Sequence, residues 1–199
     1  LQPVAPAEIV WKPDVVLPFH PNGMLFETFR NGKAEEKWTI FSVGGGALAN
    51  ETTKQTKPTD IYPPTTIAEI QKWCYDEGKT FWEYVEDYEG TDIWDYLDEI
   101  WDSMCKTIER GINNEGVLPG GLKVRRKAST YMVKAKSYND SLSSRAKLYA
   151  YALATSEENA AGGIVVTAPT CGSSGVVPAV LYHIATSRKA GPIRIWHAL

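Results

Sequence analysis

The sequence predicts an α+β protein, in which a small β module, or the tail of one, precedes a mainly α-helical domain. Up to about residue 50, short apolar stretches are interrupted by Pro, by Asn-Gly pairs and by Gly44-Gly45-Gly46, a pattern typical of strands and turns. From Thr65 onward, apolar residues recur with helical spacing. A polar stretch rich in Thr, Lys and Pro separates the two, so we expect domains at 1–50 and 65–199 joined by a linker at 51–64.

Individual elements follow from local signals. Asn31-Gly32 separates two apolar stretches, 24–29 and 38–43, and predicts a hairpin whose loop is longer than the tightest type. Thr66 with Glu69, and Thr80 with Glu83, have capping-box spacing, and they predict short helices that end at Gly78 and Gly90. An apolar stripe over 93–108 predicts a third helix that ends at Gly111. A glycine-rich turn at 116–121 and a basic stretch at 123–136 then precede a helix expected at about 141–155.

The run from Gly162 to Gly175 has the composition of an anion-binding loop between a strand and a helix. Ile164 to Val166 are β-branched and predict a short strand, and the small residues after Pro169 let a ligand approach the backbone. A helix that begins near Ser173 would direct its free N–H groups and its dipole toward a carboxylate or phosphate. Further donors would be the hydroxyls of Thr167, Thr170, Ser173 and Ser174.

Bulk properties exclude several classes of protein. The net charge of -3 argues against nucleic acid as a partner, and no apolar run approaches the roughly 20 residues of a membrane span. No signal peptide is visible, so we expect a cytoplasmic protein without a membrane partner. Cys74, Cys105 and Cys171 are widely spaced, which argues against a disulfide framework and against a compact metal site.

Several candidate sites have simpler explanations. We interpret the acidic residues between Asp76 and Glu109 as a solvated surface, partly complemented by the basic stretch around Arg125 and Arg126. Cys74 and Cys105 occupy apolar helix positions and are expected to be buried thiols. Gly44-Gly45-Gly46 lacks the residues of a phosphate-binding P-loop.

Two further residues leave alternatives open. Cys171, at a predicted helix N-terminus, is a candidate nucleophile, but it would need a base from His20, His183 or His197. A thiol that contacts substrate or packs the loop is the other interpretation. His20 either stabilises its own turn or faces a ligand.

Four stretches together resemble one family, the iron–sulfur-dependent L-serine dehydratases (L-serine ammonia-lyases) of bacteria. They are the sequences FHPNGM, SVGGG, GVLPGGL and EENAAGG continuing into VTAPTCG, at 19–24, 42–46, 116–122 and 157–172. The resemblance implies a two-part enzyme that converts L-serine to pyruvate and ammonia, with a small α+β domain followed by an all-helical catalytic domain. Under it, this chain would hold the C-terminal part of the small domain and a truncated helical domain. The resemblance also implies a [4Fe-4S] cluster, held by three cysteines, whose open iron acts on the serine hydroxyl while a base removes the α-proton.

Under this resemblance, the loop would hold the carboxylate of L-serine. No catalytic base is assigned, and an intact enzyme would be a homodimer. The expected substrate-binding residues are Asn159, Thr167, Thr170, Cys171, Gly172, Ser173, Ser174, His20 and Asn22.

The sequence also departs from the family. The cluster-binding cysteines of such enzymes lie further along, so the cluster ligands are expected outside this chain and none of its three cysteines is one. The tail 187–199 does not continue the expected pattern. We therefore expect a middle fragment that lacks dehydratase activity by itself. The alternatives are a catalytically silent fragment that binds a carboxylate or serves assembly, and a cysteine hydrolase built on Cys171.

Overall fold

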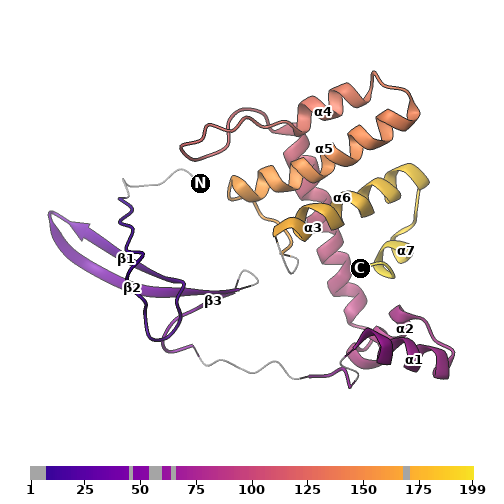
Figure 1. Cartoon of the computed structure of the whole chain (residues 1–199), viewed down its shortest axis with the longest axis horizontal. Coiled ribbons are helices and arrows are strands. Elements are labelled where there is room, and N and C mark those ends of the chain that lie inside the picture. The colour runs from indigo at the N-terminus through magenta and orange to yellow at the C-terminus, as the bar shows by residue number, and fades with distance from the viewer. Residues whose placement is uncertain (1–7, 45–46, 54–59, 64–65, 168–170) are drawn as a thin grey trace. The chain divides into compact units, whose positions relative to one another are not determined.

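The computed structural model describes residues 8–44, 47–53, 60–63, 66–167 and 171–199 (Figure 1). Contacts within the chain divide it into two compact units, Leu1–Pro58 and Thr59–Leu199. The first contains a three-stranded antiparallel sheet, and the second is helical wherever it has regular structure. The predicted α+β class is therefore confirmed.

The sheet has the order β1-β2-β3, with β1 at Gly23–Arg30, β2 at Lys33–Gly44 and β3 at Ala47–Ala49. Arg30 pairs with Lys33, so the β1–β2 turn is only Asn31-Gly32. Both turn residues have positive φ angles, 52° and 75°, which is the signature of the tight type I′ turn. The longer loop expected from the sequence is wrong, because the mostly charged residues 33–37 belong to strand β2.

Two helices begin the second unit, α1 at Ile67–Glu77 and α2 at Phe81–Glu89. The Thr66 hydroxyl accepts a hydrogen bond from the backbone N–H of Glu69, whose carboxylate accepts one from the backbone N–H of Thr66, and the predicted capping box is thereby confirmed. Gly78 ends α1 in the left-handed conformation, at φ 67°. Aromatic rings then join the two helices, in a cluster of Tyr62, Trp73, Tyr84 and Tyr88.

Helix α3, Ile93–Asn113, carries the apolar stripe that the sequence indicated, with Met104 and Ile108 buried. Gly111 does not end this helix, contrary to expectation. A Cβ atom placed on Gly111 would lie 2.4 Å from the carbonyl oxygen of Ala154, so this glycine is needed for the close approach of α3 to the helix that carries Ala154.

The remaining helices are α4 at Ala128–Ala135, α5 at Asp140–Ala160, α6 at Cys171–Arg188 and α7 at Pro192–Trp196. Helix α5 contacts α3, α4 and α6, and Figure 1 shows it between α4 and α6. A core of Ile108, Tyr151 and Ala179 lies where α3, α5 and α6 meet. The sequence did not predict α4, and α5 extends beyond the expected 141–155. None of the helices in the described parts of the chain is long and apolar enough to cross a membrane.

Candidate functional site

Two glycines turn the backbone sharply at the end of α5. Gly162 has a φ of 76°, the left-handed region that favours glycine, and its N–H donates to the carbonyl of Asn159. The N–H of Gly163 donates to the carbonyl of Glu158 over 2.8 Å. A Cβ on Gly163 would lie 2.9 Å from Oε2 of Glu158, so a side chain at this position would displace the Glu158 carboxylate. Both glycines therefore serve the turn itself.

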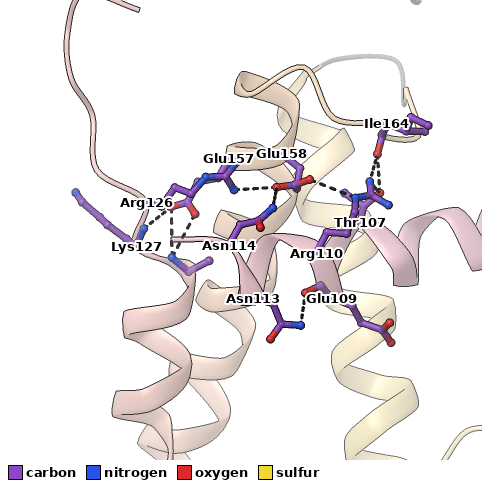
Figure 2. Close-up of polar contacts among 11 residues, drawn as sticks. Thr107, Glu109, Arg110, Asn113, Asn114, Arg126, Lys127, Glu157, Glu158 and Ile164 are labelled. Atoms are coloured by element: carbon purple, nitrogen blue, oxygen red, sulfur yellow. Dashed lines mark hydrogen bonds and ion pairs between the residues drawn. The ribbon is translucent and has the colours of Figure 1, made fainter. Parts of the chain in front are cut away.

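The residues after this turn run alongside α3 without forming a strand. The carbonyl oxygen of Ile164 accepts a hydrogen bond from Nη2 of Arg110 over 2.6 Å, and the hydroxyl of Thr107 lies 2.8 Å from the same oxygen (Figure 2). The side chain of Ile164 is exposed. The short strand predicted at 164–166 is wrong, because this β-branched segment pairs with side chains of a helix instead of another strand.

Glu158 is a buried residue at the centre of a network of polar side chains. Only 4% of the residue is exposed, and its carboxylate accepts from Arg110 Nε at 3.3 Å, Asn114 Nδ2 at 2.9 Å and Arg126 Nη1 at 2.8 Å (Figure 2). Burial raises the pKa of Glu158, but the hydrogen bonds from Asn114, Arg126 and Arg110 outweigh it and leave the pKa below its usual value. The carboxylate is therefore ionised and fully partnered at neutral pH.

The same network corrects one expectation from the sequence. Arg126 was expected to help neutralise the acidic helices. It pairs instead with Glu158, and its own side chain is only 9% exposed.

The neighbouring residue in α5, Glu157, caps the start of helix α4. Its Oε1 accepts from the backbone N–H of Lys127 over 2.6 Å and lies 3.3 Å from the backbone nitrogen of Ala128 (Figure 2). A carboxylate at this place satisfies free N–H groups and complements the positive end of the helix dipole. The signal for α4 thus lies 30 residues away in the sequence, which explains why local spacing did not predict it.

Helix α6 begins at Cys171 and packs closely on α5. A Cβ on Gly175 would lie 2.9 Å from Oγ of Ser156 and 3.4 Å from the carbonyl of Ala152, so Gly175 allows this contact. Ser174 is buried, at 6% exposure. Thr170 lies outside the described residues, and the structure describes 171–173, which hold Cys171, Gly172 and Ser173, by their helical backbone alone.

The other expected substrate-binding residues lie in two places. Asn159 and Thr167 are both exposed, on either side of the Gly162-Gly163 turn. His20 and Asn22 belong to the other unit, where Nδ1 of His20 accepts from the backbone N–H of Asn22 over 3.2 Å. This hydrogen bond supports the turn-stabilising interpretation of His20. The substrate contacts of all four stay a prediction.

The histidines of the helical unit are engaged away from Cys171. Nε2 of His183 lies 2.9 Å from Oγ of Ser144, and His183 is twelve residues along α6 from Cys171, about 18 Å by helical rise. His197 stacks on Trp82, as described below. Neither imidazole is therefore placed as a base for a Cys171 nucleophile.

The described cysteines do not fit an iron–sulfur cluster. Among the residues that the structure describes, no three His, Cys, Asp or Glu side chains gather as a metal site. Cys74 is buried in α1 and Cys105 is half-buried in α3. Burial, with smaller contributions from Glu109 and Asp102, raises the pKa of the Cys105 thiol to about 11, which disfavours the thiolate that binds metal.

Comparison with known proteins identifies the family. The family model described as serine dehydratase alpha chain matches residues 36–199, and the one described as serine dehydratase beta chain matches residues 3–53. The chain belongs to the serine dehydratase family. Residues 42–46, 116–122 and 157–172, which carry most of the resemblance, all lie within the alpha-chain match.

Individual relatives agree with this assignment. L-serine dehydratase 2 of Escherichia coli is 35% identical over 178 residues, which cover 83% of this chain and 39% of that protein. L-serine dehydratase of Streptomyces coelicolor is 37% identical over 180 residues, covering 84% and 40%. The enzyme of that name from Mycobacterium tuberculosis is 34% identical over 221 residues, covering 95% and 44%. The chain spans about two fifths of the length of these serine dehydratases.

The tail of the chain is also part of the family pattern. The alpha-chain match extends through residue 199, so the departure expected at 187–199 is wrong. Two side chains of this tail contact helices α2 and α3. His197, just after α7, stacks on Trp82 with ring centroids 3.9 Å apart and planes 2° from parallel, and it lies 5.5 Å from Trp94. Nε1 of Trp196 donates to Asp98 over 3.2 Å.

Proposed function

We propose that this chain is part of an L-serine dehydratase, in which L-serine loses water to give 2-aminoacrylate, which then hydrolyses to pyruvate and ammonia. The observation that carries the proposal is the serine dehydratase alpha-chain match over residues 36–199. Relatives named L-serine dehydratase, from three bacterial species above, support the same substrate.

In this proposal, the chain supplies the side of the site that binds the substrate carboxylate. The backbone N–H groups of the first turn of α6 have no acceptor within the helix, and the helix dipole adds partial positive charge there. Thr167, Thr170, Ser173 and Ser174 add hydroxyl groups, and Asn159 adds an amide. The close packing of Gly175 on α5 supports this role, because a carboxylate site gains affinity when its donors are fixed in advance.

The family cofactor, a [4Fe-4S] cluster, belongs to the proposal for the intact enzyme. The described cysteines, Cys74 and Cys105, do not fit as its ligands, so the ligands would come from the rest of the intact enzyme. The proposal includes a homodimeric enzyme in the cytoplasm, with L-serine as its small-molecule partner.

The test is a hybrid enzyme. Residues 3–199 replace the matching segment of L-serine dehydratase 1 of Escherichia coli, which is 36% identical to this chain over 178 residues. The hybrid should form pyruvate from L-serine. A folded hybrid that shows the visible absorbance of its iron–sulfur cluster, but forms no pyruvate, would contradict the proposal.

The carboxylate site is tested in the same hybrid. Replacing Ser173 and Ser174 together by Ala should raise the KM for L-serine, because two candidate hydroxyl donors are lost. The matched control replaces two exposed hydroxyl residues near the other end of α6, Thr186→Ala and Ser187→Ala, which should leave the KM unchanged. If KM and turnover are the same in both double variants, the carboxylate is bound elsewhere.

A binding experiment covers the case in which the hybrid does not fold. The chain is labelled with isotopic glycine, and L-serine is added while the backbone N–H resonances are recorded. Gly172 and Gly175 should shift, and Gly32 in the hairpin should not. Shifts without activity in a folded hybrid would favour the silent carboxylate-binding alternative.

A further inference from the structure

The 162–167 segment is held to α3 by polar contacts. The side chain of Ile164 is 76% exposed, so burial of apolar surface cannot fix this residue. Its carbonyl oxygen, by contrast, meets Nη2 of Arg110 at 2.6 Å and the Thr107 hydroxyl at 2.8 Å. Hydrogen bonds from Arg110 and Thr107 therefore help to fix the path of the backbone after α5.

Arg110 joins this carbonyl to the buried carboxylate of Glu158. Its Nε lies 3.3 Å from Oε2 of Glu158, while its Nη2 reaches Ile164, so two sides of one planar guanidinium are used. Glu158 is itself fixed by Arg126 and Asn114. An ammonium group is a point charge and cannot reproduce this two-sided geometry.

We propose that Arg110 is a positioning residue for the carboxylate site, because it helps to set the path of the backbone from α5 through Ile164 to Thr167, one of the residues of that site. The proposal rests on the proposed function, since the ligand being positioned is the carboxylate of L-serine. Arg110 itself does not touch the substrate in this arrangement.

Arg126 provides a matched control. It donates to the same carboxylate over 2.8 Å, but it has no contact with the 162–167 segment among those that the structure describes. Its side chain is only 9% exposed, against 42% for Arg110. If the network had a purely structural role, loss of Arg126 would lower both the stability and the L-serine affinity more than loss of Arg110. A positioning role predicts that the two substitutions separate, with Arg126 affecting stability and Arg110 affecting binding.

The experiment uses the complete chain with isotopically labelled glycine. Titration with L-serine gives the Kd from the resonances of Gly172 and Gly175, and hydrogen exchange of the Gly163 N–H reports on the turn without any ligand. The variants are Arg110→Ala, Arg110→Lys and Arg126→Ala. Because Arg110 lines an open polar groove of about 530 Å³, ethylguanidinium can be added to Arg110→Ala to replace the lost group.

Arg110→Ala should raise the Kd for L-serine roughly tenfold or more, since small misplacements of binding groups are costly. It should also speed exchange at Gly163, and millimolar ethylguanidinium should restore both properties. Arg110→Lys should restore neither. Arg126→Ala should lower the melting temperature more than Arg110→Ala does, while changing the Kd less.

The outcomes separate the two proposals. If the unsubstituted chain does not bind L-serine, the carboxylate site is wrong; Gly163 exchange in Arg110→Ala then still decides whether Arg110 fixes the segment. If the chain binds L-serine and Arg110→Ala binds it equally well, the positioning role is wrong. The positioning role is also wrong if Arg110→Lys restores the Kd and the Gly163 exchange rate, or if ethylguanidinium restores neither of them in Arg110→Ala.

Discussion

Glu158 shows how much one residue depends on partners that are distant in the sequence. Its carboxylate is contacted by Arg110, Asn114 and Arg126, which lie 48, 44 and 32 positions away. Two of the donors are neighbours, Arg110 in the last turn of α3 and Asn114 at its C-cap, and the third, Arg126, comes from the segment before α4. None of them has a local spacing to Glu158, so the sequence drew attention to the glycines and hydroxyls of the loop and missed the charges that support it.

We predict that Glu158→Gln lowers the free energy of unfolding by about 3 kcal/mol at neutral pH, the typical cost of removing one partner of a buried ion pair. Arg126, which is almost fully buried, would then lack its counter-charge. Urea unfolding of the two proteins measures the difference. The control is Glu35→Gln, because the exposed Glu35 pairs with Arg30 on the surface. If Glu158→Gln lowers the free energy of unfolding no more than this control does, the prediction is wrong.

The same carboxylate predicts a pH dependence. The pKa of Glu158 is lower in the folded chain than its usual value of 4.5, so its contribution to stability is complete above that value. As the pH falls from there toward the folded pKa, the unfolded chain takes up the proton first and the contribution is lost. The free energy of unfolding, measured at several pH values across this acidic range, should fall more steeply with falling pH for the unsubstituted chain than for Glu158→Gln. If it falls equally steeply for both proteins, the pKa of Glu158 is not lowered in the folded chain.

At the scale of elements, Gly111 makes the contact between α3 and α5 possible. Gly111→Ala should destabilise the chain by about 1–3 kcal/mol, because the added Cβ meets the backbone of Ala154, which cannot rotate away. Gly121→Ala is the control, since a Cβ there meets nothing within 4 Å. Thermal unfolding of the two variants measures the effect, and equal melting temperatures would show that the helices separate at little cost.

The sequence predicted those elements whose signals are local. The capping residues Thr66 and Glu69, and the apolar stripe of α3, act within a few residues and were read correctly. The predicted strand at 164–166 failed because β-branched residues indicate an extended backbone but do not supply a pairing partner. Helix α4 was missed because Glu157 caps it from α5. The expected stop at Gly111 was wrong because a glycine can serve a close contact as well as a helix end.

At the scale of the whole molecule, the chain carries the family pattern over about two fifths of the length of its relatives. We predict that the purified chain, supplied with iron and sulfide under anaerobic conditions, forms no pyruvate from L-serine. The physical reason is that Cys74 and Cys105, the described thiols, are placed as packing residues, and the thiol of Cys105 stays protonated. The hybrid enzyme assayed in parallel is the positive control. Pyruvate formed by the chain alone would overturn the prediction.

The stack of His197 on Trp82 has a use outside catalysis. An imidazole stacked on an indole shields it from water, and two of the chain's seven tryptophans, Trp82 and Trp94, are described in contact with this ring. Because indole emission moves to longer wavelength when the ring meets water, a variant or fragment with a detached tail would show a red-shifted emission. The fluorescence of the chain therefore reports whether its last helix is docked, without an added dye.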